Sequence, residues 1–221
     1  MSSGLAWNEK SCSDPANSWN RMKAAVDSVR YALEQPVVAQ PGIIYNYNGG
    51  GTMILARAVA KATGKQVDEY AREKLFTPLG IVDFGWGELP ATGEPAAAAG
   101  LRLRPRDTAK IGQLMLADGF WQGRRVLPAG WVEQSTKPWV NGWRFYRYGY
   151  QWWIGDSYLR DHEITWFAGL GLGGQRLYVV PALDLVVVVN CGLYVEGPYH
   201  SLQETVPRGI LENVVLRAVK A

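Results

Sequence analysis

The sequence predicts an α+β fold, in which an antiparallel sheet is flanked by helices. The first half of the chain holds stretches in which apolar residues recur at helical spacing. The second half holds short β-branched and aromatic runs interrupted by Gly and Pro, and one more helical stretch closes the chain. Because the 221 residues contain no repeat or linker, we expect a single domain over residues 1–221.

The expected helices are recognised by apolar spacing and by the residues at their ends. Gly64 follows an Ala-rich stretch and favours a helix end there, whereas Pro105 precedes another stretch, where proline suits a first turn. A short helix is expected after Pro128-Ala129-Gly130. The longer helical stretches are 20–33, 52–62, 67–75, 107–116 and 206–219.

The expected strands are four runs rich in aromatic and β-branched residues, which indicate antiparallel strands in succession. Residues 181–184 are expected to form a short hairpin connection, and residues 2–17 and 89–100 to form loops. The runs are 148–154, 164–168, 175–180 and 183–190.

The composition excludes several classes of protein. Hydrophobic residues make up 48% and charged residues 19%, a globular balance that argues against disorder, and a net charge of +3 gives no basic surface for nucleic acid. The longest apolar run, 185–189, is far too short for a membrane span. Two distant cysteines, Cys12 and Cys191, are expected to be free thiols, with a disulfide between them as the alternative. Scattered acids with two histidines suggest no metal and no organic cofactor.

The segment 41–51 is the most informative part of the sequence. A Pro-Gly turn and a run of aromatic residues lead into three glycines and an apolar helix. This order places Tyr47 beside a helix N-terminus, where free N–H groups and the helix dipole favour an anion. A phenolate would then cost less than usual, and Tyr47 is a candidate general base. The alternative is a tight loop with packed tyrosines.

A second candidate is the glycine-rich segment 167–175. Its glycines allow a backbone to approach a ligand closely, and N–H groups there could stabilise an oxyanion. It is not a phosphate-binding loop, because no Lys-Ser/Thr follows and a strand comes next. A glycine-rich hairpin without function is the alternative. The 10 tryptophans similarly fit either core packing or the wall of an apolar cleft.

Several segments, in order along nearly the whole chain, resemble the serine β-lactamase-like hydrolases, the class C β-lactamase, penicillin-binding-protein and esterase type. Ser2-Ser3-Gly4-Leu5 resembles the Thr-Ser-Gly-Leu stretch of that family, and Pro41-Gly42 with Tyr47 resembles its tyrosine loop. The other matching segments are 75–81, 101–107 continuing to Trp131, and Gly173-Gly174-Gln175 continuing to Val186. The resemblance implies a β-lactamase/DD-peptidase-like fold of which the N-terminal part is missing.

The resemblance also implies serine acyl-transfer chemistry. In that family a Ser from a Ser-x-x-Lys motif attacks a carbonyl, and water resolves the acyl-enzyme. Tyr47 would be the general base and acid, and the N–H of Leu172 would bind the oxyanion. Gly169-Leu170-Gly171 would match the Lys/His-x-Gly strand motif. The residues implied to contact the substrate are Asn48, Gly49, Gly169, Gly171 and Gln175.

Three departures limit this comparison. No serine is followed three residues later by lysine; Ser18, for example, is followed by Arg21. We therefore expect the nucleophile segment to lie ahead of Met1, as in a truncated chain that is inactive alone. Gly49 replaces the Asn of the usual Tyr-x-Asn, and Gly169 replaces the Lys or His that helps bind a carboxylate. These two changes favour an ester, amide or short-peptide substrate over a β-lactam.

Other interpretations stay open at this point. The chain could be a non-catalytic module that binds a small ligand or peptide, or an active hydrolase with Ser11 or Ser13 as nucleophile. A Ser-His-Asp triad would have to use His162 or His200. The compartment is open between periplasm and cytoplasm, since no signal peptide begins the chain. A sheet without its N-terminal strands should have an open edge, and we expect a homodimer to cover it.

Overall fold

The structure, a computed structural model, describes residues 1–195 and 197–219, and its contacts divide the chain into two compact units. Unit 1 covers Met1–Arg104 and unit 2 covers Pro105–Ala221. Both units combine helices with antiparallel strands, which confirms the α+β class. A single domain over 1–221 remains a prediction, and each unit is described by itself.

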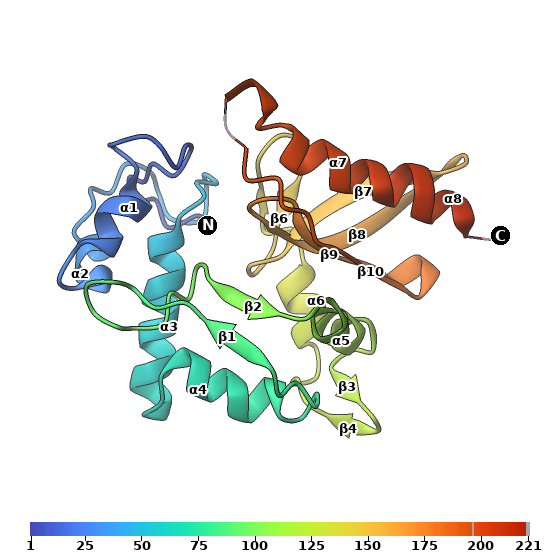
Figure 1. Cartoon of the computed structure of the whole chain (residues 1–221), viewed down its shortest axis with the longest axis horizontal. Helices are drawn as coiled ribbons and strands as arrows, with labels where there is room; N and C mark the ends of the chain where they lie inside the picture. Colours follow the sequence, from blue (N-terminus) through green and yellow to red (C-terminus); the bar gives the residue numbers. More distant parts are fainter. Residues whose placement is uncertain (196, 220–221) are drawn as a thin grey trace. The chain divides into compact units, whose positions relative to one another are not determined.

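Unit 1 is built around its longest helix, α3 (Gly49–Thr63) (Figure 1). The helix ends as predicted at Gly64, which caps it in the left-handed conformation with φ 72°. The remaining elements are α1 (Ser18–Lys23), α2 (Ser28–Leu33), α4 (Val67–Ala71) continued by a π-helical turn (Arg72–Phe76), and the antiparallel pair β1 (Phe84–Trp86) and β2 (Leu101–Leu103).

The single helix predicted over 20–33 is wrong, because the chain breaks between α1 and α2. Asp27 causes the break. Its carboxylate accepts hydrogen bonds from the N–H groups of Val29 at 3.0 Å and Arg30 at 3.1 Å, and so begins a new helix. Apolar spacing alone could not separate one long helix from two short ones that keep Met22 and Val29 buried.

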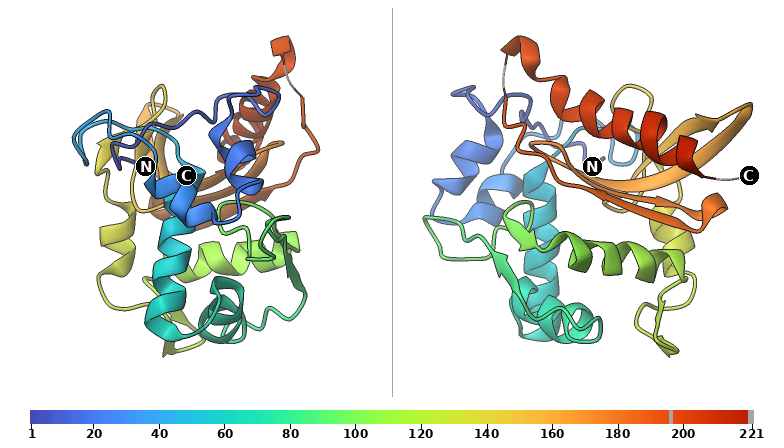
Figure 2. Two further views of the ribbon diagram at one scale, coloured as in Figure 1. Left: turned by 90° about the vertical axis from the view of Figure 1, so that its left-hand side faces the viewer. Right: turned by 45° about the vertical axis from the view of Figure 1, so that its right-hand side comes forward.

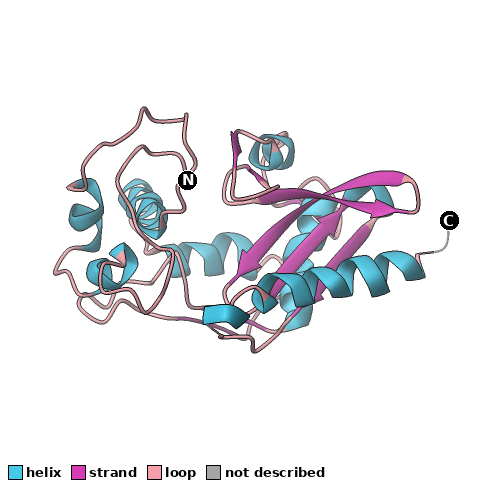
Figure 3. Ribbon diagram, turned by 90° about the horizontal axis from the view of Figure 1, so that it is seen from above, coloured by secondary structure: helices cyan, strands magenta, loops and turns pink. Residues whose placement is uncertain are grey.

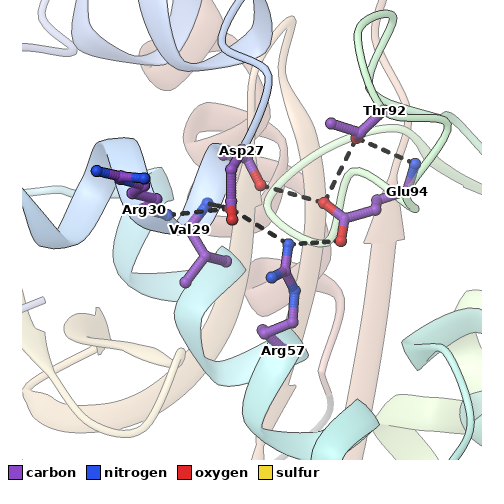
Figure 4. A network of polar contacts seen from close by, with 7 residues as sticks. Asp27, Val29, Arg30, Arg57, Thr92 and Glu94 are labelled. Carbon is purple, nitrogen blue, oxygen red and sulfur yellow. Dashed lines mark hydrogen bonds and ion pairs between the residues drawn. The ribbon is translucent and has the colours of Figure 1, made fainter.

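An ion-pair network ties α2 and α3 of unit 1 to the loop that holds Glu94 (Figure 4). Arg57 of α3 lies 3.4 Å from Asp27 and 2.6 Å from Glu94, both measured from Nη2 to a carboxylate oxygen. The hydroxyl of Ser28 donates to the other oxygen of Glu94 at 3.3 Å. The core beside this network consists of Trp7, Met22, Val29, Ala32, Met53, Leu89 and Ala96.

Unit 2 is a six-stranded antiparallel sheet with helices on both faces (Figure 2). The C-terminal helical segment covers one face and α5 the other, as the right-hand view of Figure 2 shows. Figure 3 shows the strands in magenta with the helix that leads to the C-terminus beside them. The strands follow in sequence order: β5 (Val140–Asn141), β6 (Arg147–Tyr148), β7 (Trp153–Leu159), β8 (His162–Gly171), β9 (Gln175–Val180) and β10 (Leu185–Val189). The other elements are α5 (Pro105–Leu116), the β3 (Phe120–Trp121) and β4 (Arg124–Arg125) hairpin, α6 (Trp131–Thr136), 3-10 turns at Pro181–Leu183 and Gly197–Tyr199, α7 (Leu202–Ile210), a π-helical turn (Leu211–Val215) and α8 (Leu216–Ala218).

The strand predicted over 148–154 is also wrong, because residues 149–152 form a turn between β6 and β7. Here the backbone bonds to α6 instead of a neighbouring strand. The N–H of Tyr150 donates to the carbonyl of Ser135 at 2.8 Å, and a Cβ at Gly149 would lie 2.2 Å from that same oxygen. Gln151 takes a positive φ of 64° to complete the turn. Glycine at 149 was the sequence signal for this close approach.

The outermost strand of the sheet is β10, and its outer edge pairs with no strand among the described residues. Leu185 to Val188 are half-buried, so the strand is apolar up to its open edge. The open edge expected from the sequence is therefore present. No helix in the described part of the chain is both long enough and apolar enough to cross a membrane.

Candidate functional site

Tyr47 lies directly before the first residue of α3 and is 38% exposed. This position agrees with the sequence-based expectation of a tyrosine at a helix N-terminus. The residues that surround the start of the helix decide how easily its hydroxyl ionises.

Glu9, which the sequence did not single out, occupies the N-terminus of α3. Its Oε2 accepts hydrogen bonds from Gly49 N at 2.8 Å and from Trp7 Nε1 at 2.6 Å. Burial raises the pKa of Glu9, and the two hydrogen bonds partly oppose this change. The anion that the helix dipole favours is thus Glu9, a carboxylate supplied by the chain itself.

The expectation that the Tyr47 phenolate costs less than usual is therefore wrong. Burial of the hydroxyl, followed by the negative charge of Glu9, raises the pKa of Tyr47 above its ordinary 10.0. Near neutral pH Tyr47 is a phenol and can donate a proton. To accept one from a nucleophile, it would need a neighbouring cation that counteracts Glu9.

Gly49 and Gly50 are glycines because other side chains pack on their backbone. A Cβ at Gly49 would lie 2.9 Å from Trp19 Cε3 and 3.1 Å from Glu9 Oε2, and a Cβ at Gly50 would lie 2.6 Å from Trp7 Cη2. The Asn found at position 49 in the family pattern would collide with Trp19 and Glu9. The departure at this position is thus coupled to the placement of Glu9.

Asn48, predicted to contact a substrate, serves as the N-cap of α3. Its Oδ1 accepts from Gly51 N at 2.9 Å, and the residue is 2% exposed. Its Nδ2 is buried without a hydrogen-bond partner among the described residues. The cap explains why Asn follows Tyr47, whereas substrate contact by Asn48 and Gly49 remains a prediction.

The glycine-rich segment forms the β8–β9 hairpin, with residues 172–174 as its turn. Gly173 and Gly174 adopt left-handed φ values of 76° and 84°, which disfavour other residues. Leu172 is 56% exposed, and its N–H makes no backbone hydrogen bond within the described ranges. This N–H is thus not already bonded within the backbone, as an oxyanion donor must be.

The other predicted residues of the hairpin have different surroundings. Gly169 and Gly171 lie within β8, and a Cβ at Gly171 would meet Gln175 Cβ at 3.1 Å, whereas at Gly169 there is room. Gln175 begins β9, and its side-chain amide donates to the carbonyl of Cys191. Substrate contact by these three residues remains a prediction.

The rival nucleophiles have no activating partner within the described part of the chain. Ser11 and Ser13 lie on an exposed loop, where their hydroxyls hydrogen-bond to each other at 3.0 Å. His200 Nδ1 lies 3.3 Å from Gln203 Nε2, and no hydrogen bond to a serine or carboxylate is found for either His200 or His162. Cys12 and Cys191 are free thiols, as expected.

The aromatic residues of unit 2 are divided between the core and the surface: Trp166, Phe167 and Tyr178 are buried, whereas Trp131, Trp139 and Trp143 are exposed. Trp152 packs edge-on against Phe167, and Trp153 meets Tyr148 in the same way, with ring centroids 5.2 and 4.9 Å apart. A groove of about 530 Å³ does lie on the α5 and α6 side of the sheet, but its apolar lining is mostly aliphatic. The lining residues are Met115, Leu116, Asp118, Val132, Thr136, Ile154, Glu163, Ile164, Thr165, Trp166, Phe167, Pro181 and Ala182.

A comparison with known families matches residues 1–201 to the Beta-lactamase family model. The chain belongs to the beta-lactamase family. The 6-aminohexanoate-dimer hydrolase of Paenarthrobacter ureafaciens is 27% identical over 154 residues, which cover 65% of this chain and 38% of that relative. This family member therefore spans well under two thirds of the length of that hydrolase.

Solved structures agree with the family at the level of the fold. A provisionally named 6-aminohexanoate-dimer hydrolase from Bacillus anthracis superposes with a TM-score of 0.72 at 22% identity, over 96% of this chain and 58% of its own. A penicillin-binding protein from Bacillus halodurans gives a TM-score of 0.64 at 16% identity, over 94% and 71%. The resemblance to β-lactamase-like hydrolases inferred from the sequence is thus confirmed.

Proposed function

We propose that this chain is part of a serine hydrolase that cleaves an ester or amide through an acyl-enzyme. Tyr47 would transfer the proton, and the N–H of Leu172 would stabilise the oxyanion. The observation that carries the proposal is the presence of these two groups in a beta-lactamase family chain: a partly exposed tyrosine at the start of α3 and, in the glycine-rich turn, the N–H of an exposed leucine that makes no backbone hydrogen bond among the described residues.

The substrate class follows from one substitution and one charged side chain. With Gly at 169, β8 offers no cationic side chain at the position where the family binds a carboxylate. At the start of α3, the side chain of Glu9 supplies a negative charge. We therefore favour a substrate without a carboxylate beside the scissile bond. The Paenarthrobacter relative, named for hydrolysis of a 6-aminohexanoate dimer, supports an amide, because a dimer of an amino acid is joined by one.

The proposal includes inactivity of the chain alone, because no Ser-x-x-Lys is present to supply the nucleophile. The raised pKa of Tyr47 supports this view, since the lysine of that motif is the cation that would make the phenolate accessible. The purified chain should react neither with a fluorophosphonate probe nor with a chromogenic short-chain ester. Labelling of this chain, mapped to Ser11 or Ser13, would overturn the assignment of the nucleophile.

The positive test uses a longer chain that adds the in-frame sequence upstream of Met1. If that sequence encodes Ser-x-x-Lys, the longer chain should be labelled and should turn over esters or amides. In that chain Tyr47→Phe should lower kcat by about 10²- to 10⁴-fold. An upstream stop codon together with saturable binding of a small ligand would favour the non-catalytic module instead.

We further propose that a second copy of the chain covers the open edge of β10. Five consecutive apolar residues without proline or charge form this strand, and such an edge pairs readily with its own copy around a two-fold axis. Light scattering on the purified chain should therefore give the mass of a dimer, and a monomer at micromolar concentration would refute the proposal.

A further inference from the structure

Arg176, the second residue of β9, is buried beneath the glycine-rich turn with 7% of its surface exposed. A charged side chain in such a place normally pairs with a carboxylate. Among the described residues Arg176 forms no ion pair; its hydrogen bonds go to three backbone carbonyls and to the hydroxyl of Tyr178. This unusual set of partners needs an explanation.

The three carbonyls all belong to the glycine-rich turn or to the helix that supports it. Nη1 donates to the carbonyl of Gly171 at 2.6 Å and to that of Gln175 at 2.9 Å, and Nη2 donates to the carbonyl of Gln203. The guanidinium therefore joins the two ends of the turn to α7. Its fixed fork of donors suits this task better than a lysine would.

Gln203 of α7 also holds the glycine-rich turn, and we refer to Arg176 and Gln203 together as the clamp. Its Oε1 accepts from Gly173 N at 2.7 Å, and its Nε2 donates to the carbonyl of Val195 at 2.7 Å. The residue is 7% exposed. Gln203 thus holds the turn through neutral hydrogen bonds, while Arg176 holds it through charged ones.

The carbonyl of Gly171 and the N–H of Leu172 belong to one peptide group. A cation that binds the oxygen of a peptide draws electron density away from its nitrogen, so the N–H at the other end becomes a stronger donor. Tyr178, the nearby ionisable group, does not cancel the charge, because burial raises its pKa to about 12 and keeps it neutral.

We propose that Arg176 is a positioning residue that polarises the Gly171–Leu172 peptide and so strengthens Leu172 N–H as an anion-binding donor. The inference deepens the proposed function, since it concerns the same N–H group, but it can be tested without any hydrolysis. It also accounts for a buried cation whose hydrogen bonds go mainly to carbonyls.

The test is the rate at which the Leu172 N–H exchanges with water, measured by NMR on the 221-residue chain labelled with ¹⁵N-leucine. Base-catalysed exchange passes through an amide anion, which a neighbouring cation stabilises. A unit charge roughly 4.5 Å from the nitrogen accelerates the reaction about fivefold even at the dielectric constant of water. Leu172 should therefore exchange at least about fivefold faster in the folded chain than in an unstructured peptide of residues 168–176.

Two variants separate charge from structural support. Arg176→Met should slow exchange at Leu172 by at least about fivefold. Gln203→Met removes the neutral half of the clamp and keeps the charge, so it should leave the Leu172 rate unchanged or raise it. If Arg176 only supports the turn, Arg176→Met will resemble Gln203→Met. That result, or a folded chain that exchanges no faster than the peptide, overturns the proposal, whereas failure of hydrolysis alone does not affect it.

Discussion

The three glycines that begin α3 can be used to compare two effects of a Gly→Ala substitution: stabilisation of the helix and overcrowding of the neighbouring side chains. Each is to be replaced by alanine in turn. At Gly51 the nearest atom to a new Cβ is Asn48 Cγ at 3.9 Å, so the methyl group fits. At Gly50 it would lie 2.6 Å from Trp7 Cη2 and 2.9 Å from Ala32 Cβ, both part of a packed core. Gly49 is intermediate, with Trp19 Cε3 at 2.9 Å.

Gly51→Ala lowers the backbone entropy of the unfolded chain, so less entropy is lost on folding, and it should stabilise the chain by about 0.5–1 kcal/mol. At Gly50 the same gain is opposed by overpacking, which costs about 1–3 kcal/mol, so a net loss of about 1–2 kcal/mol is expected. For a chain of this size each kcal/mol changes Tm by roughly 2–4 °C. Thermal unfolding followed by circular dichroism should therefore give opposite shifts in neighbouring variants. Equal stability of the two would refute the packing argument.

Three further predictions concern other parts of the chain. Because burial raises the folded-state pKa of Glu9, its contribution to stability is full below the unfolded pKa and is lost as pH rises through the folded value. Glu9→Gln should therefore flatten the decline in unfolding free energy as pH rises above about 4 in urea titrations. Asn48→Ala should cost about 1 kcal/mol through loss of the α3 cap, and an unchanged urea midpoint would contradict that role. Leu185→Lys places a charge on β10 and should convert the expected dimer into a monomer in light scattering; because Leu185 also packs against the core of unit 2, Tm should fall as well.

Much of the fold could be predicted because it depends on periodicity and on Gly and Pro. The end of α3 at Gly64 and the strand at Gln175–Val180 follow from local sequence. The two errors came from single polar contacts between segments or within a turn. Asp27 begins a second helix with its own carboxylate, and the carbonyl of Ser135 draws residues 149–152 away from a strand. Apolar spacing carries no information about such contacts.

Some residues of the candidate site could likewise be predicted from the sequence, and others could not. Tyr47 and Leu172 could be named from motifs, because motifs lie on contiguous residues. Glu9 could not, since it reaches Gly49 from 40 positions away in the chain. For Arg176 a signal did exist: it is the one charge within the apolar run 175–180. A charge at a buried strand position marks a residue whose hydrogen bonds must be accounted for.

The strict sequence order of β5 to β10 has a consequence for how unit 2 folds. Every strand pairs with the strand before it, so few contacts of the sheet require distant segments to meet, and loop-closure entropy stays low. The sheet can then grow strand by strand as the chain is synthesised, beginning at β5. Folding of this unit should be fast for a β-rich structure, and the last strand to join, β10, stays available for intermolecular pairing longest.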